Sequence, residues 1–194
     1  MRSTLLLSIT AAISLSVPAW TTAIQVLEPP LRMTAFAVNM SNVGRGGANT
    51  VIIEIERWST DAQRERLITA FKEKGPSGLL SALQKERRIG YMRLPNSLGY
   101  DLQYARKHPG ADGGAQIIIL TDRHIGFWEA RDRPRTIDYP FTLLDIRLNA
   151  SGEGEGKLSV ATKITYSEKK GTVELENYAS EPVRLQNIKT EAKR

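Results

Sequence analysis

The run Ile117-Ile118-Ile119-Leu120 is apolar at every position and decides the fold that the sequence predicts. Successive side chains of a strand point to opposite faces, so four apolar residues in a row predict a central strand that is covered on both faces. Turn-forming residues occupy 109–114, and apolar residues alternate with polar ones over 100–106. The stretch 100–120 therefore predicts a hairpin, with helices over one face of its sheet.

The segment that follows this hairpin continues as a meander of short strands. Turn residues at 151–156 and 168–171 separate its apolar, alternating segments. Several short strands joined by such turns are typical of a β-sandwich or a barrel. The segments concerned are 144–148, 158–166, 173–176 and 183–185.

Strands are also predicted nearer the amino terminus, over 32–39, 51–56 and 89–93. Alternation in the first of them places Met33, Ala35 and Ala37 on one face. Between the first two lies a turn-rich connector, 41–49.

A change of period at Thr60 predicts a helix. Thr60 and Gln63 have the spacing of a capping box, in which each side chain bonds the other residue's free backbone amide. Gly75-Pro76 is expected to end this helix, and 77–86 to form a second one with leucines on its inner side. The two helices are expected to form a hairpin that covers one face or mouth of the sheet.

Together these signals predict a mainly β (α+β) fold, an antiparallel β-sandwich or barrel of about eight strands with a two-helix insertion covering one face or end. One β-rich domain is expected over 32–190, with the helical hairpin at 60–86. An extended leader at 24–31, which contains Pro29-Pro30, precedes the domain, and a disordered tail at 191–194 follows it.

The first residues have the pattern of an export signal. Arg2 precedes an apolar run from Leu5 to Val17, which is shorter than the roughly 20 residues of a membrane span. Cleavage is expected after Ala19 or Ala23, which makes 1–23 a signal peptide and the mature chain periplasmic or secreted. No second apolar run of that length follows, so no transmembrane span is expected after cleavage.

The absence of cysteine excludes a disulfide framework, a thiolate metal site and a cysteine nucleophile, and it favours a bacterial envelope over a eukaryotic secretory route. The net charge of +6 allows contact with anionic lipid or envelope polysaccharide. Because the basic residues are scattered among 21 acidic ones, a mixed, solvated surface is expected, and nucleic acid is not expected as a partner. The partner classes left open are a small amphipathic ligand, an envelope polymer and a protein.

Polar reactive residues are most concentrated in 121–135. His124 could act as a general base, with Glu129 as the carboxylate that orients it. The arginines of this segment are suited to bind an anion, and Trp128 is suited to stack on a ligand. The alternative is a solvated loop, because neighbouring strand residues point to opposite faces. A glycine-rich loop around Arg45 is a weaker anion site. The candidate binding residues are Arg45, Arg123, His124, Trp128, Glu129, Arg131 and Arg133.

Catalytic patterns are scarce in the rest of the chain. Its two histidines, His108 and His124, lack the spacing of a metal site, so neither a metal nor another cofactor is expected. No nucleophile-elbow motif surrounds a serine, and Asn96-Ser97-Leu98-Gly99 is interpreted as a turn. These observations weigh against an enzyme.

Four segments resemble a group of exported bacterial proteins that has no assigned activity, and the likeness extends over most of the mature chain. The resemblance implies export and a compact domain, and it assigns no catalytic residue. The segments are 55–60, 126–130, 160–166 and 174–178.

The sequence therefore predicts an exported β domain that serves as a binding or structural module. The alternative is a hydrolase or isomerase that uses the polar segment 121–135.

Overall fold

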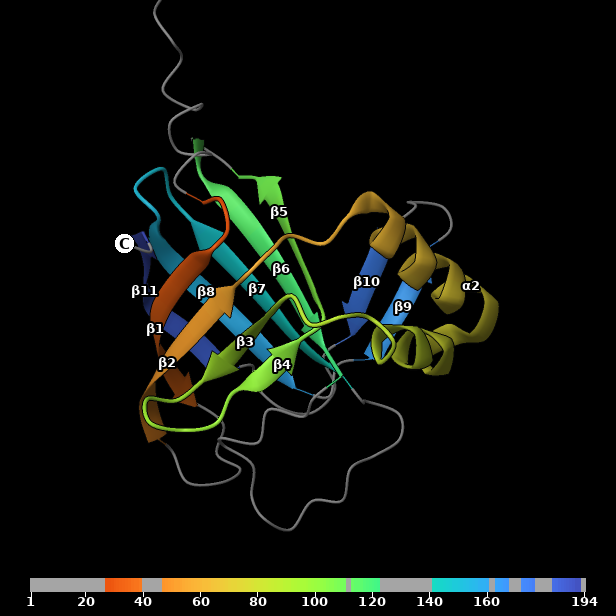
Figure 1. Cartoon of the computed structure of the whole chain (residues 1–194), viewed down its shortest axis with the longest axis horizontal. Coiled ribbons are helices and arrows are strands. Elements are labelled where there is room, and N and C mark those ends of the chain that lie inside the picture. The colour runs from red at the N-terminus through yellow and green to blue at the C-terminus, as the bar shows by residue number, and fades with distance from the viewer. Residues whose placement is uncertain are drawn as a thin grey trace, which may run out of the picture.

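The computed structural model describes residues 27–39, 47–110, 113–122, 141–160, 163–167, 172–176 and 183–192. These residues form eleven strands and one helix, arranged as Figure 1 shows. The helix is α2, Asp61–Leu83. The strands are β1 Leu31–Asn39, β2 Gly47–Ile55, β3 Gly90–Arg93, β4 Tyr100–Leu102, β5 Tyr104–Pro109, β6 Ala115–Thr121, β7 Thr142–Leu148, β8 Glu153–Val160, β9 Lys163–Ser167, β10 Thr172–Glu176 and β11 Val183–Ala192.

Nine of the strands form one antiparallel sheet in the order β4-β3-β2-β1-β11-β8-β7-β6-β5. Apart from β11, which lies between β8 and β1, neighbours in the sheet are neighbours in the sequence. The residues expected as a tail overlap the end of β11, where Glu191 and Ala192 pair with Arg32 and Leu31.

The sheet nearly closes on itself, because its two edge strands are consecutive in the chain. Only Gln103 separates them, so Leu102 of β4 pairs with Gly90 of β3 while Tyr104 of β5 pairs with Leu120 of β6. Between these pairs the backbone N–H of Gln103 donates to the carbonyl of Leu120 at 3.4 Å. Of the two predicted architectures, the barrel is the one that forms. It has nine strands instead of about eight, since the change of partner at Gln103 divides the predicted strand over 100–106.

Alternation along the strands places one row of apolar side chains inside the barrel, as predicted for Met33, Ala35 and Ala37. A side chain lining a cavity wide enough for water would retain exposed area. Many of the inward side chains are 0 % exposed, so they fill the space around them. They include Met33, Val51, Ile53, Ile89, Met92, Leu102, Ile117, Ile119, Leu144, Ile146, Leu158, Leu185 and Ile188.

A second, smaller apolar cluster lies outside the barrel, between α2 and strands β6 and β7. Ile117 and Ile119 face the barrel interior, whereas Leu120 is buried in the outer cluster and Ile118 packs against it. The prediction that this strand is covered on both faces is confirmed. The buried members of the outer cluster are Leu67, Phe71, Leu79, Leu83, Leu120, Phe141 and Leu143.

The start of α2 is capped as predicted. The Gln63 N–H donates to Thr60 Oγ1 at 3.2 Å, and the Thr60 N–H donates to Gln63 Oε1 at 3.0 Å. The predicted pair of helices corresponds to the single element α2, in which non-helical dihedral angles at Gly75 separate two helical limbs. Gly75 has φ 63° and ψ −151°, which turns the chain sharply, and helical turns resume from Pro76. The helix ends at Leu83 instead of near Glu86.

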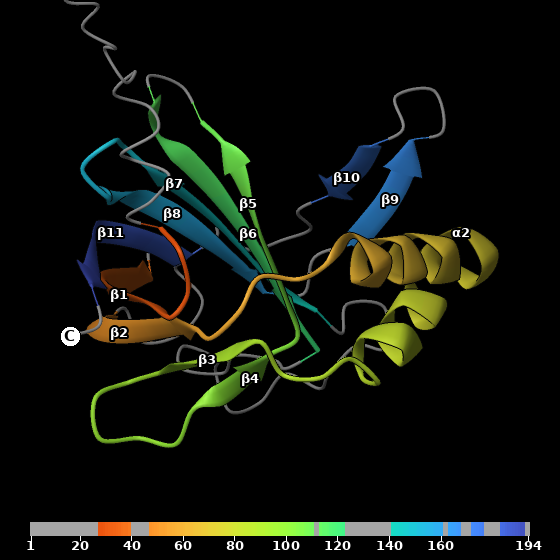
Figure 2. The same cartoon turned by 45° about the horizontal axis from the view of Figure 1, so that its top comes forward.

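Strands β9 and β10 form a separate antiparallel pair outside the barrel sheet. Figures 1 and 2 place this pair next to α2, with β9 the nearer of the two strands to the helix. The expectation that these segments continue the barrel meander is therefore wrong, although their mutual pairing is as predicted.

Candidate functional site

The predicted binding residues lie outside the described part of the chain, so their mutual arrangement stays a prediction. The residues concerned are Arg45, Arg123, His124, Trp128, Glu129, Arg131 and Arg133.

The polar segment predicted as a site begins where the barrel closes. Thr121 is fully buried at the end of β6, and its hydroxyl donates to the carbonyl of Asp101 at 2.8 Å. The next residue, Asp122, donates its backbone N–H to Gln103 Oε1 at 3.3 Å. These bonds join the end of β6 to β4 and to Gln103, so they fix the chain at Thr121 and Asp122, where the predicted segment begins.

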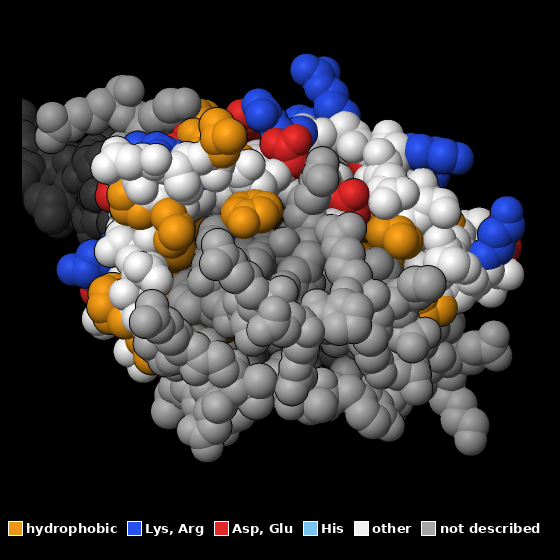
Figure 3. Space-filling model, turned by 90° about the horizontal axis from the view of Figure 1, so that it is seen from below, with side chains coloured by type: hydrophobic (Ala, Val, Ile, Leu, Met, Phe, Trp, Pro, Cys, Tyr) orange, Lys and Arg blue, Asp and Glu red, His pale blue; other side chains and the backbone are white. Residues whose placement is uncertain are grey.

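Within the described residues, the strongest concentration of positive charge is on α2 and its flanks. We call residues 57–88 the helical arm. It has eight basic and four acidic residues in a chain whose net charge is +6. Figure 3 shows Lys and Arg side chains projecting from the end of the molecule where Figure 1 places α2.

The helical arm folds back at Gly75 into two limbs, 61–74 and 76–83, which pack closely. A Cβ at Gly78 would lie 2.3 Å from the carbonyl oxygen of Ala70 and 2.6 Å from Cβ of Lys74. The absence of a side chain at position 78 therefore permits this approach.

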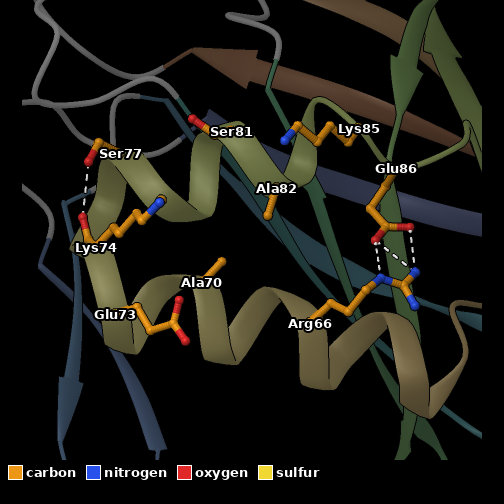
Figure 4. A pocket seen from close by; sticks show the side chains of 10 residues that line it. Arg66, Ala70, Glu73, Lys74, Ser77, Ser81, Ala82, Lys85 and Glu86 are labelled. Atoms are coloured by element: carbon orange, nitrogen blue, oxygen red, sulfur yellow. Dashed lines mark hydrogen bonds and ion pairs between the residues drawn. The ribbon is translucent and has the colours of Figure 1, made fainter.

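A hollow of about 330 Å³ lies between the limbs, as Figure 4 shows. The apolar residues Leu67, Phe71, Leu79 and Leu83 pack in the outer apolar cluster, so the hollow uses the other sides of the limbs. Its lining consists of Arg66, Ala70, Glu73, Lys74, Ser77, Gly78, Ser81, Ala82, Lys85 and Glu86.

One end of the hollow is fixed by the carboxylate of Glu86, which is only 10 % exposed. Glu86 accepts from Gln63 Nε2 at 2.8 Å and from Arg66 Nε and Nη2 at 2.9–3.1 Å. Arg57 Nη1 donates to Gln63 Oε1 at 3.3 Å, and its Nη2 donates to the carbonyl of Arg87 at 2.9 Å. This network joins the start of the first limb to the residues that follow the second limb.

Two lysines give the rest of the hollow its positive charge. Lys74 and Lys85 are both exposed, and no carboxylate of the described residues forms an ion pair with either. Ser77 Oγ donates to the carbonyl of Lys74 at 2.9 Å, while Ser81 is exposed on the second limb. Neither serine has a neighbouring histidine within the lining, so the arrangement is suited to bind a ligand and lacks an activated nucleophile.

A second polar feature crosses the outer face of the barrel. Register partners on β11, β1, β2, β3 and β4 align in one row. We call this row, which consists of Glu191, Arg32, Glu54, Tyr91 and Asp101, the outer charged row. Arg32 lies 3.3 Å from Glu191 and 3.7 Å from Glu54.

The outer charged row changes the titration of its tyrosine. A hydrogen bond to Glu54, together with burial and the Glu54 charge, raises the pKa of Tyr91, and Arg93 opposes this effect. The guanidinium of Arg88 lies 6.0 Å from the Tyr91 ring centroid and also contacts Asp101 at 3.6 Å. Because Arg32 and Arg88 form ion pairs with its acidic side chains, this row is suited to link the strands of the barrel wall.

Sequence reasoning missed both features. The charged positions at 66, 73, 74, 85 and 86 alternate with apolar helix positions, and this signal could have located a polar face. The hollow itself depends on the fold-back at Gly75. The outer charged row depends on strand register, which residue spacing within one strand does not specify.

Within the described ranges, no group of three or more His, Asp or Glu residues is placed to hold a metal ion. None of the helical residues described forms a segment of the length and hydrophobicity that a membrane crossing requires. Comparison of the chain with protein-family models, curated proteins and solved structures finds no match.

Proposed function

We propose that the protein is an exported, non-enzymatic binding module whose barrel is a scaffold and whose helical arm is the contact surface. Export follows from the signal-like segment at 1–23, which is expected to direct the mature chain to the periplasm or the exterior.

The packed barrel interior is the observation that carries this proposal. Inward residues from both halves of the sheet, such as Met33 and Ile146, are 0 % exposed. A small amphipathic ligand would need a cavity beside such residues. A partner is therefore better accommodated by the outer surface, which leaves the envelope polymer and protein classes.

Among the described residues, the helical arm combines exposed lysines with a concave surface. Its apolar side chains pack against β6 and β7, whereas Lys74 and Lys85 flank the hollow. The rigid barrel fixes the position of the arm, which lowers the entropy lost on binding.

Hydrogen–deuterium exchange of the mature protein, with and without washed envelope fragments from a bacterium, tests the contact surface. Protection confined to 61–86 is the expected result. Protection of the barrel strands alone, or no change anywhere, contradicts the proposal.

Native mass spectrometry tests the scaffold assignment independently. The folded mature chain is expected at its own mass, without the signal segment, which ends at Ala19 or Ala23. A lipid-sized molecule retained by the folded protein would place the ligand inside the barrel and overturn the proposal.

The enzyme alternative rests on the polar segment 121–135 and has its own test. If the purified protein hydrolyses or isomerises a substrate, and the variants His124→Ala and Glu129→Ala lose that activity while remaining folded, then the non-enzymatic assignment is wrong.

A further inference from the structure

We infer that the hollow of the helical arm binds one unit of an acidic polysaccharide. This inference rests on the proposed function and specifies its ligand class.

The charge of the hollow favours an anionic group. Lys74 on the first limb and Lys85 beyond the second limb line the same space, and the Arg66 charge is already matched by Glu86. An ammonium group is a compact charge with three donors, which suits a carboxylate or phosphate oxygen approached from several directions. The two lysines can therefore each contact an anionic oxygen of a ligand in the hollow.

The distribution of charge favours a polymer over a single small anion. Basic residues occur on the first limb and on both flanks of the helical arm, from Arg57 to Arg88, so the positive charge is spread along the arm although the second limb has none. Repeated weak contacts along a chain of regularly spaced anions gain strength by multivalency. The hollow, of about 330 Å³, is at the small end of ligand sites and suits one unit of that chain.

The other polar side chains of the hollow suit the hydroxyl groups of a sugar. Glu73 and Ser81 are exposed in the lining and supply an acceptor and a hydroxyl that both donates and accepts. A ligand with anionic groups alone would meet repulsion from Glu73. An acidic sugar satisfies the lysines with its anion and Glu73 with its hydroxyl groups.

The same surface is poorly suited to a membrane or to nucleic acid. Helices that bind in a membrane interface present an apolar face, but Leu67, Phe71, Leu79 and Leu83 are at most 7 % exposed beneath the limbs. Proteins that hold single-stranded nucleic acid supply aromatic rings for stacking, and no aromatic residue lines the hollow.

The test measures equilibrium binding of the mature protein to soluble polygalacturonate, with neutral dextran, phosphatidylglycerol vesicles and duplex DNA as comparison ligands. The variant is Lys74→Glu with Lys85→Glu. The matched control is Lys157→Glu with Arg184→Glu, two cross-strand partners on β8 and β11 that are exposed and change the net charge equally. Circular dichroism and melting confirm that each variant is folded.

Polygalacturonate is expected to bind most tightly, and dextran not at all. Charge reversal in the hollow should weaken binding by about tenfold or more, and the control by less than about threefold, because local charges act more strongly than distant, screened ones. If the charge-reversed variant is unfolded, the variant Lys74→Gln with Lys85→Gln replaces it. Its affinity for polygalacturonate is expected to fall by about threefold.

Three results overturn the inference. Equal losses in the hollow and control variants would show that only net charge acts. Tighter binding to vesicles or DNA would assign another partner class, and no binding to polygalacturonate would exclude the acidic polymer. The exchange experiment with envelope fragments includes uncharged and protein components, so the proposed binding module can survive these outcomes or fail separately.

Discussion

At the scale of single residues, Gly78 sets the distance between the limbs of the helical arm. Any side chain there would collide with the backbone of Ala70, which cannot move without disturbing the first limb. The hollow and the close packing of the limbs therefore depend on one missing methyl group.

Gly78→Ala is expected to lower the free energy of unfolding by about 1–3 kcal/mol, because the added Cβ overpacks the contact between the limbs. Ser81→Ala, on the exposed side of the same limb, should change it by less than about 0.5 kcal/mol. Urea unfolding of both variants measures the difference. Equal free energies of unfolding for the two variants would show that the limbs can move apart without destabilising the protein.

Tyr104 is expected to make the free energy of unfolding fall at alkaline pH. Burial in the outer apolar cluster raises its pKa, an effect that Arg106 and Arg64 oppose. Since the folded-state pKa exceeds the unfolded value of about 10, this contribution is complete below pH 10 and is lost as the pH rises above it.

Urea unfolding between pH 8 and pH 11 tests this effect. Wild type should lose more stability than Tyr104→Phe across that interval, because phenylalanine keeps the ring and removes the ionisable group. Tyr91→Phe serves as a comparison for the tyrosine of the outer charged row. Parallel curves for wild type and Tyr104→Phe would contradict the expectation.

At the scale of elements, α2 shows which features of a helix can be predicted from neighbouring residues alone. Thr60 and Gln63 specified the start of the helix correctly, because a capping box involves only neighbouring residues. Gly75-Pro76 correctly marked a break, and helical turns resume after it as predicted, but the close packing of the two limbs depends on contacts that only the fold brings together. The partners of Glu86 depend on the same packing, so sequence spacing could not supply them.

Thr60→Ala should lower the free energy of unfolding by about 1 kcal/mol, because the N–H of Gln63 loses its capping oxygen. Thr69→Ala, at an exposed position inside the first limb, should be neutral or slightly stabilising, since alanine is the better helix former. Thermal melting of the pair is the measurement. A destabilised Thr69→Ala with an unchanged Thr60→Ala would contradict the assigned cap.

At the scale of the whole molecule, two adjacent leucines of β7 belong to different apolar clusters. Leu144 is 0 % exposed inside the barrel, whereas Leu143 lies beneath the helical arm. The chain thus provides a matched pair for separating the stability of the barrel from the docking of the arm.

Leu144→Ala is expected to lower the global free energy of unfolding by about 2–5 kcal/mol, the usual cost of a core truncation. Leu143→Ala should mainly reduce amide protection in 61–83, because it removes a contact of the arm and leaves the barrel interior packed. Hydrogen exchange resolved by segment distinguishes the two. Uniform loss of protection in Leu143→Ala would mean that barrel and arm unfold as one unit.

The sequence was sufficient to predict the class of the fold, because alternation at 32–39, 51–56 and 100–120 reports burial directly. The near-closure of the barrel could not be predicted from the sequence. It depends on the change of strand partner at Gln103, which occurs only when both edge strands are in place. The exclusion of β9 and β10 from the barrel also depends on long-range pairing. The candidate site at 121–135 remains a prediction, whereas the hollow became visible only when the limbs were brought together.

The place of β11 between β8 and β1 has a consequence for biogenesis. A ribosome releases β1 long before β11, so the contacts of β11 with β1 and β8 become available only at the end of synthesis. Until then one edge of β1 is unpaired and the sheet cannot close. The topology therefore delays closure of the barrel until its last strand has been synthesised.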